Sequence, residues 1–140
     1  MRLIDSGLEI LSTEECQDLL RRATIGRVAV TVGTLPAVFP VNYALLGDDI
    51  VFFTGAGTKL RAAVDQAVVA FEVDDFGATP AYGWSVLAVG RATEITDGEP
   101  LAGARRLRLR PFAGGDRSHL VRIRPEFLSG RRVCTGPVAD

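Results

Sequence analysis

Residues that commonly bind metal ions are scarce in this 140-residue chain, which has one histidine and two cysteines. Cys16 and Cys134 lie far apart in the sequence, and neither belongs to a C-x-x-C motif. A structural zinc site needs four ligands at characteristic spacings, so we expect no metal site. Two distant cysteines also form no disulfide framework, and we expect both thiols to be reduced in the cytoplasm.

A surplus of charge and a long apolar run are also missing. The net charge of −1 argues against a nucleic-acid-binding protein, because such proteins need a basic surplus. No apolar run approaches the length of a transmembrane helix. Residues 1–9 carry early acids and no continuous apolar segment, which is not typical of a signal peptide. We therefore expect a cytoplasmic protein that binds neither nucleic acid nor a membrane.

Alternating valines and short apolar runs predict a mainly β protein, a small antiparallel barrel with a few short helices. A length of 140 residues corresponds to a single domain over 1–140, with 1–11 and 136–140 at its periphery. A helix begins after Ser12, which forms a capping box with Glu15, and further helices are expected at 58–65 and 97–109. The expected strands are 27–32, 35–46, 50–54, 67–74, 83–96, 118–124 and a short final strand within 125–133.

Proline and glycine predict irregularities in these strands. Pro36 and Pro40 cannot donate to a sheet ladder, so the strand at 35–46 should lie at an edge, or contain a kink or bulge. Gly90 lies inside the strand at 83–96 and predicts a bend or bulge there. Gly47 indicates a hairpin turn.

The most informative segment is FFTGAGTKLRAA at 52–63, where a strand, a glycine-containing loop and a helix follow one another. It holds Lys59, the only lysine in the chain. The glycines let backbone N–H groups approach an anion, and a helix start adds donors. With the hydroxyls of Thr54 and Thr58 and the charge of Lys59, the segment predicts a site for a phosphate group on a larger ligand. The alternative is an ordinary turn in which Thr58 caps the helix.

Four further features each have two interpretations. The sole histidine, His119, is either a proton donor near a ligand or a surface residue. The arginines within 105–110 form either the solvated face of a helix or a groove for an acidic ligand tail. Trp84 is either a core residue or a ligand contact. Asn42 lies in an apolar strand and needs a polar partner, which either a turn beside Pro40 or a ligand provides.

Six segments follow one another in an order found in one known family. They are PVNY at 40–43, FTGAGTK at 53–59, AFEVD at 70–74, GWSV at 83–86, RA at 91–92 and VRIRP at 121–125. This order resembles the pyridoxamine 5′-phosphate oxidase-like family, the flavin-binding split barrels, in its short actinobacterial branch near the nitroimidazole reductases. The resemblance implies a homodimer of six-stranded antiparallel split barrels with FMN at the subunit interface.

The resemblance also assigns residues to the cofactor. In the family, a strand end and its loop hold the flavin phosphate, the preceding strand lies along the isoalloxazine ring, and the start of the fifth strand reaches the flavin from one subunit or the other. The residues implied are Thr54, Gly55, Thr58 and Lys59 for the phosphate, Val41, Asn42 and Tyr43 along the ring, and Trp84 and Ser85 from the fifth strand.

The resemblance implies an oxidoreductase of a small organic substrate, in which the flavin supplies the redox chemistry. It assigns no catalytic residue. The sequence GRRVCT at 130–135 lacks the C-terminal Arg/His substrate motif of true pyridoxamine phosphate oxidases, which argues against vitamin B6 oxidation. The alternatives are an F420-dependent reductase, whose acidic cofactor tail suits the arginines of 105–110, and a non-enzymatic flavin-binding or storage protein. Other barrels of this kind bind haem, for which His119 is the only imidazole ligand.

Overall fold

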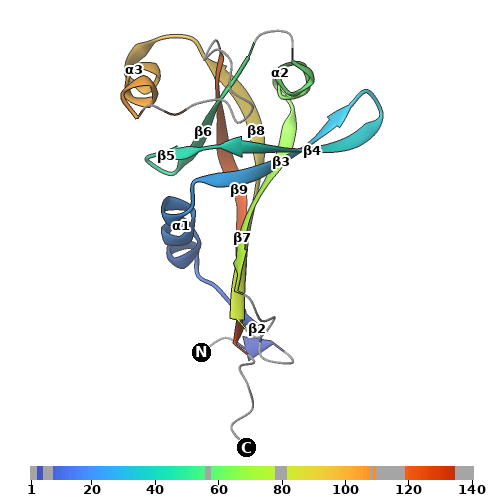
Figure 1. Ribbon diagram of the computed structural model, residues 1–140, viewed down its shortest axis with the longest axis vertical. Coiled ribbons are helices and arrows are strands. Elements are labelled where there is room, and N and C mark those ends of the chain that lie inside the picture. The colour runs from blue at the N-terminus through green and yellow to red at the C-terminus, as the bar shows by residue number, and fades with distance from the viewer. Residues whose placement is uncertain are drawn as a thin grey trace, which may run out of the picture.

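A computed structural model of the chain describes residues 3–4, 8–55, 58–77, 82–107, 109 and 119–134. The described part contains nine strands and three helices, in the order shown in Figure 1. Their bounds are β1 Leu3–Ile4, β2 Leu8–Ile10, α1 Thr13–Arg22, β3 Ile25–Val32, β4 Leu35–Asn42, β5 Ala44–Leu46, β6 Asp49–Thr54, α2 Lys59–Ala63, β7 Val68–Phe76, β8 Tyr82–Ile95, α3 Gly98–Arg106 and β9 His119–Cys134.

The strands form one curled antiparallel sheet in the order β1-β2-β9-β8-β7-β3-β4, and β6 joins it by pairing with both β9 and β5. Six of these strands are long, namely β3, β4, β6, β7, β8 and β9, and they confirm the predicted split barrel. The other three, of two or three residues each, raise the strand count above the six expected. In Figure 1 the strands β7, β8 and β9 extend away from α2 and α3 as a long arm, and β2 lies at its far end.

The predicted strand at 35–46 is two strands, β4 and β5, which separate at Tyr43. The two prolines do not interrupt β4. Pro36 and Pro40 lie opposite Thr31 and Arg27 of β3. In the sheet order β4 is the terminal strand, so the predicted edge position is confirmed and its prolines need no second ladder partner.

The predicted break between 118–124 and 125–133 is absent, because β9 is one strand of 16 residues. Pro125 is tolerated in its interior because the ladder with β8 shifts register at this point: Val89 pairs with Phe127, whereas Gly90 pairs with Pro125. The extra residue, Glu126, makes a β-bulge, which is where a proline fits inside a sheet. The bulge predicted at Gly90 is confirmed.

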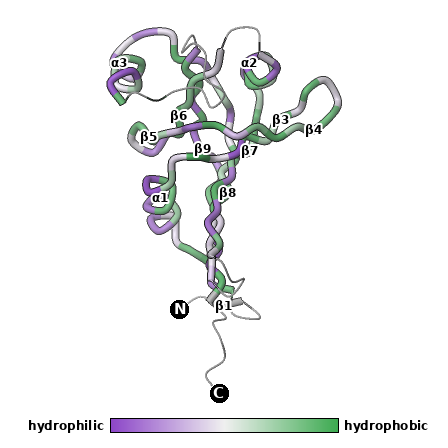
Figure 2. The backbone as a smooth tube through the Cα atoms, in the orientation of Figure 1, coloured by the Kyte–Doolittle hydropathy of each residue, from purple (hydrophilic) through white to green (hydrophobic). Residues whose placement is uncertain are grey.

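A core of apolar side chains fills the curled sheet. Helix α1 covers one opening with Cys16, Leu19 and Leu20, the face predicted from the sequence, and its capping box at Ser12 is present. The inward-facing residues of β7 are Val69, Phe71 and Val73, also as predicted. Figure 2 shows the hydrophobic β6 inside the fold and hydrophilic residues on the outer side of α1.

The chain ends and the last helix differ from the expected boundaries. Residues 8–10, expected at the periphery, pair with β9, and Leu11 is buried in the core, whereas 136–140 lie outside the described residues. Helix α3 spans 98–106, so Arg105 and Arg106 are exposed in its last turn, while Arg108 and Arg110 are not described. Among the helices described, none is long and apolar enough to cross a lipid bilayer.

Candidate functional site

The predicted phosphate loop lies at the end of β6, where α2 covers the interior of the barrel. Thr58 caps α2 as expected: its hydroxyl oxygen accepts from the Arg61 N–H at 3.0 Å, and the hydroxyl donates to the Gly55 carbonyl oxygen at 3.0 Å. Lys59 follows it and is exposed. Residues 56–57 of the loop are outside the described residues, so the structure describes Gly55 and Thr58 on either side of them and leaves the phosphate site a prediction.

Two buried polar atoms at this end have no hydrogen-bonding partner among the residues described. One is the hydroxyl oxygen of Thr54, a side chain that is only 3% exposed, and the other is Nε of Arg61. A buried polar group without a partner costs about 1–3 kcal/mol, and most such groups in native proteins are paired. Both atoms donate hydrogen bonds, so a ligand oxygen is the type of atom that satisfies them.

Three ionisable side chains from separate elements meet beside Thr54. Glu94 of β8 accepts from Arg61 Nη2 at 2.6 Å through one oxygen and lies 2.6 Å from His119 Nδ1 through the other. The hydrogen bond from His119, with the charge of Arg61, holds the pKa of Glu94 below its usual range against the opposing effect of burial. Glu94 is therefore ionised at neutral pH and accepts from both neighbours.

The sequence alone does not predict the cluster of Arg61, Glu94 and His119. The three residues lie 33 and 25 positions apart along the chain, and only sheet register brings them together. Thr54 lies directly opposite His119 in the β6–β9 ladder, and side chains so paired lie on the same face of a sheet. The available signal was an ionisable residue near one end of each of two predicted strands, Glu94 in 83–96 and His119 in 118–124. Only the pairing register between the strands shows that these two residues meet.

The residues predicted to lie along the flavin ring are at the end of β4 and just after it. In the sheet order, β4 is the terminal strand, whereas β6, which carries Thr54, pairs with β9 and β5. Val41 and Tyr43 are 3% exposed, and Asn42 is half-buried. The Tyr43 hydroxyl donates to the Leu20 carbonyl at 2.5 Å, and its N–H donates to the Thr24 carbonyl at 3.1 Å. Burial raises the pKa of the Tyr43 hydroxyl above its usual range. Tyr43 is therefore a well-anchored core residue, and its place beside a flavin remains a prediction.

Trp84 and Ser85 are half-buried near the far end of the arm, opposite Asp75 and Asp74 of β7. Trp84, Asp74 and Asp75 line a cavity of about 420 Å³ together with residues at the end of α1. Trp84 and Glu94 are ten residues apart on β8, which corresponds to about 33 Å of strand. Along β8, Trp84 and Ser85 are therefore far from the predicted phosphate site, whereas Trp84 shares its cavity with Thr24, whose carbonyl accepts from the Tyr43 N–H.

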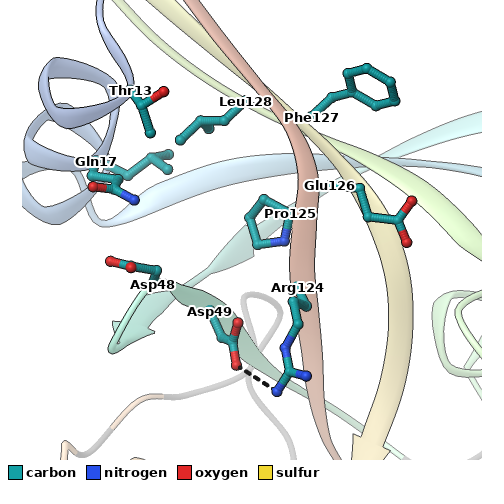
Figure 3. A pocket seen from close by; sticks show the side chains of 10 residues that line it. Thr13, Gln17, Asp48, Asp49, Arg124, Pro125, Glu126, Phe127 and Leu128 are labelled. Carbon is teal, nitrogen blue, oxygen red and sulfur yellow. Dashed lines mark hydrogen bonds and ion pairs between the residues drawn. The ribbon is translucent and has the colours of Figure 1, made fainter.

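A larger cavity of about 600 Å³ lies between α1, the β5–β6 turn and the bulge of β9. Figure 3 shows its polar lining, including the ion pair of 3.5 Å between Asp49 and Arg124. None of the residues predicted to bind the cofactor lines this cavity. In the described part of the chain, no three histidine, cysteine, aspartate or glutamate side chains are grouped to hold a metal ion.

Comparison with known proteins assigns the chain to a family. The family model described as pyridoxamine 5′-phosphate oxidase matches residues 12–132, nearly the whole barrel. The chain belongs to the pyridoxamine 5′-phosphate oxidase family. The family resemblance found in the sequence is therefore confirmed.

The similar proteins include two solved structures and one curated relative. The FAD binding protein from Mycobacterium smegmatis is 38% identical, with a TM-score of 0.77, and the match covers 89% of this chain and 97% of that one. A FAD-binding protein from Mesorhizobium loti is 26% identical, with a TM-score of 0.71, over 89% and 96% of the two chains. The protein Rv0080 of Mycobacterium tuberculosis is 35% identical over 88% of this chain and 84% of its own length. This member of the pyridoxamine 5′-phosphate oxidase family thus shares its fold over most of its length with proteins described as binding FAD.

Proposed function

We propose that this protein is an FMN-binding flavoprotein that acts as an oxidoreductase of a small organic substrate. The observation that carries the proposal is the pair of unpartnered buried donors, Thr54 Oγ1 and Arg61 Nε, at the end of β6 in the described part of the chain. They lie where the sequence predicts a phosphate site, and the similar protein from Mycobacterium smegmatis is described as binding FAD. FAD contains the FMN moiety, so one phosphate site suits either cofactor.

The residues present fit a phosphate group. Lys59 offers a flexible positive charge, Thr54 a hydroxyl, and Gly55 a backbone at the start of the loop. A bound flavin would carry electrons between a donor and a substrate. The residues of this chain would hold its phosphate, orient its ring against the backbone of Val41 and Asn42, and exclude water.

We further propose that two copies of the chain share each cofactor. Trp84 and Ser85 are separated from the phosphate end of their own chain by about 30 Å of strand, which is longer than an FMN molecule. A flavin with its phosphate at Thr54 would then meet Trp84 and Ser85 of a second copy of the chain. The arm formed by β7, β8 and β9 is the element that would reach across (Figure 1).

A row of apolar residues on the outer face of the sheet supports this homodimer. Val38, Ala29, Ala70, Val89 and Phe127 are successive cross-strand partners from β4 to β9. The two ends of the row are 61% and 72% exposed. A contiguous apolar stripe across a sheet is typical of an interface, and an identical stripe on a second copy is its simplest complement.

A visible absorption spectrum of the purified protein, with mass spectrometry of what denaturation releases, tests the proposed cofactor. We expect a flavin spectrum and the mass of FMN. Release of FAD would correct the cofactor but keep the phosphate site. A colourless protein that binds F420 but neither flavin would overturn the proposal. Rapid reduction of the bound flavin by NAD(P)H, followed by reoxidation with an organic acceptor, distinguishes an oxidoreductase from a storage protein.

Replacing Lys59 with alanine should weaken FMN affinity by about one to two powers of ten, the loss expected for a charge-assisted contact to phosphate. Riboflavin, which lacks the phosphate, should bind the variant and the wild type equally. Fluorescence titration of the apoprotein measures both affinities. Arg106→Ala is the matched control, because Arg106 is an exposed cation on α3. Equal loss of both ligands in Lys59→Ala would contradict a phosphate contact.

Replacing Phe127 with aspartate should convert the dimer to a monomer, because a charge would be buried within the apolar interface. Sedimentation velocity at micromolar concentration measures the change. Leu35→Asp is the control: Leu35 is 69% exposed but lies on the other face of β4, with the same alternation as the inward-facing Val41. A wild type that sediments as a monomer would refute the shared site.

A further inference from the structure

The cluster of Arg61, Glu94 and His119 has a further role in the proposed site. We propose that Arg61 and His119, held by their shared carboxylate Glu94, bind the flavin phosphate together with Thr54, and that His119 contributes only when it is protonated. This inference rests on the proposed function, because it concerns the phosphate of a flavin bound at the same end of the barrel. It adds two binding residues and a pH dependence.

The geometry places the cluster at the mouth of the barrel. Below it lie Phe52 and Val121, a fully buried pair on the same face as Thr54 and His119. Above it lies α2, which carries Arg61 and packs Leu60 against the core. Thr54, whose hydroxyl has no partner among the described residues, is directly opposite His119.

Burial argues that the cluster is more than a surface ion pair. The side chains of Arg61, Glu94 and His119 are 23%, 24% and 27% exposed. Charged groups at this depth lose hydration and need partners for their remaining donors. Glu94 satisfies only part of Arg61, since Nε remains without a partner in the described chain. An anion beside Thr54 and Arg61 supplies the missing acceptor.

The tautomer of His119 decides when it can contribute. Because Glu94 is ionised and lies 2.6 Å from Nδ1, the hydrogen of the neutral imidazole is on Nδ1. Nε2 then presents a lone pair, which repels a phosphate oxygen. Protonation places a hydrogen on Nε2 and converts it into a charged donor. The protonated form of His119 therefore adds a charged donor to the phosphate that the neutral form lacks.

Neighbouring groups in the described chain define the electrostatics of His119. β8 presents Glu94, α2 presents Arg61 with Lys59 two residues before it, and β6 presents only the neutral hydroxyl of Thr54. With His119 neutral, the cluster of three carries no net charge. With His119 protonated it carries one positive charge, in addition to Lys59, which favours a phosphate dianion.

Two variants and two ligands test the inference. Apoprotein of the wild type, Arg61→Gln and His119→Gln is titrated with FMN and with riboflavin at pH 5.5, 7 and 8.5, and thermal unfolding confirms that each variant folds. We expect Arg61→Gln to weaken FMN binding about tenfold or more at every pH, with riboflavin changed less than twofold. His119→Gln should weaken FMN binding at pH 5.5 and match the wild type at pH 8.5. The phosphate itself also changes charge in this pH range, but this affects the wild type and both variants equally. The difference between the wild type and His119→Gln therefore reports His119 alone.

Each outcome has a distinct meaning. Arg106→Gln breaks an exposed arginine–glutamate pair of 2.7 Å on α3 and is the matched control for loss of such a pair. If Arg61→Gln weakens FMN and riboflavin equally, the cluster only supports the fold and the inference is wrong. If the wild type binds FMN but neither variant alters its preference over riboflavin, the inference is also wrong, and the proposed function stands. If the wild type binds neither flavin, the proposed function itself fails.

Discussion

Replacing Gly90 with alanine should destabilise the protein by about 3 kcal/mol or more. A Cβ atom at Gly90 would lie 2.1 Å from the Arg124 carbonyl oxygen and 2.9 Å from its carbon. Both are backbone atoms of the neighbouring strand, so no side-chain rotation relieves the overlap. The two strands must separate at the bulge, which breaks ladder hydrogen bonds on either side. Urea denaturation of the two proteins measures the difference.

Gly77→Ala is the control for the Gly90 variant. Gly77 follows β7 and is exposed, and a Cβ atom added there would meet no heavy atom within 4 Å among the described residues. Its replacement should change the free energy of unfolding by less than about 0.5 kcal/mol. If Gly90→Ala were as stable as Gly77→Ala, the register of β8 against β9 at the bulge would have to differ from the one described.

Replacing Phe71 with alanine should lower the free energy of unfolding by about 3–5 kcal/mol. Phe71 is fully buried, and its ring packs edge to face against Tyr43, with centroids 4.8 Å apart and planes at 73°. The ring occupies the space above Gly26, where a Cβ atom would lie 2.2 Å from its Cζ. Removing it leaves a cavity between β3, β7 and the β4–β5 junction. The backbone predicted to lie along the flavin ring loses its support there.

Phe76→Ala on the same strand is the comparison for Phe71→Ala. Phe76 is 49% exposed near the end of the arm, and its loss should cost about 1 kcal/mol or less. Both variants are measured by urea denaturation, and flavin affinity is measured where they fold. A cost for Phe71→Ala close to that for Phe76→Ala would contradict its central position in the core.

Much of the fold could be predicted because local patterns and the final packing agree. The alternation of Val69, Phe71 and Val73, the face of α1 around Cys16, and the bulge at Gly90 each follow from the residue's own chemistry. Such features need only the period of a strand or a helix, or the absence of a side chain. The structure confirms the inward-facing residues of β7, the buried face of α1 and the bulge at Gly90.

The features that were missed depend on register. In the sequence alone, Pro125 indicates the end of a strand. In the structure it lies inside β9, where the bulge opposite Gly90 of β8 accommodates it. The break at Tyr43 follows from its burial under α1, where its hydroxyl meets Leu20. The cluster around Glu94 exists only because β6, β8 and β9 align at one end. Pairing between distant strands is fixed by the whole core, which a single sequence pattern does not encode.

Strand β9 pairs with β8 along its length, with β6 through 119–123 and with β2 through 131–133. It is also the last of the described elements to be synthesised. Until it leaves the ribosome, both β6 and β8 have a bare edge, and the pairing of Thr54 with His119 must then close a loop of about 65 residues. Such non-local closure is slow, and unpaired edges attract other chains. The nascent protein should therefore depend on chaperones until its final strand is made, and acquire resistance to proteases in one late step.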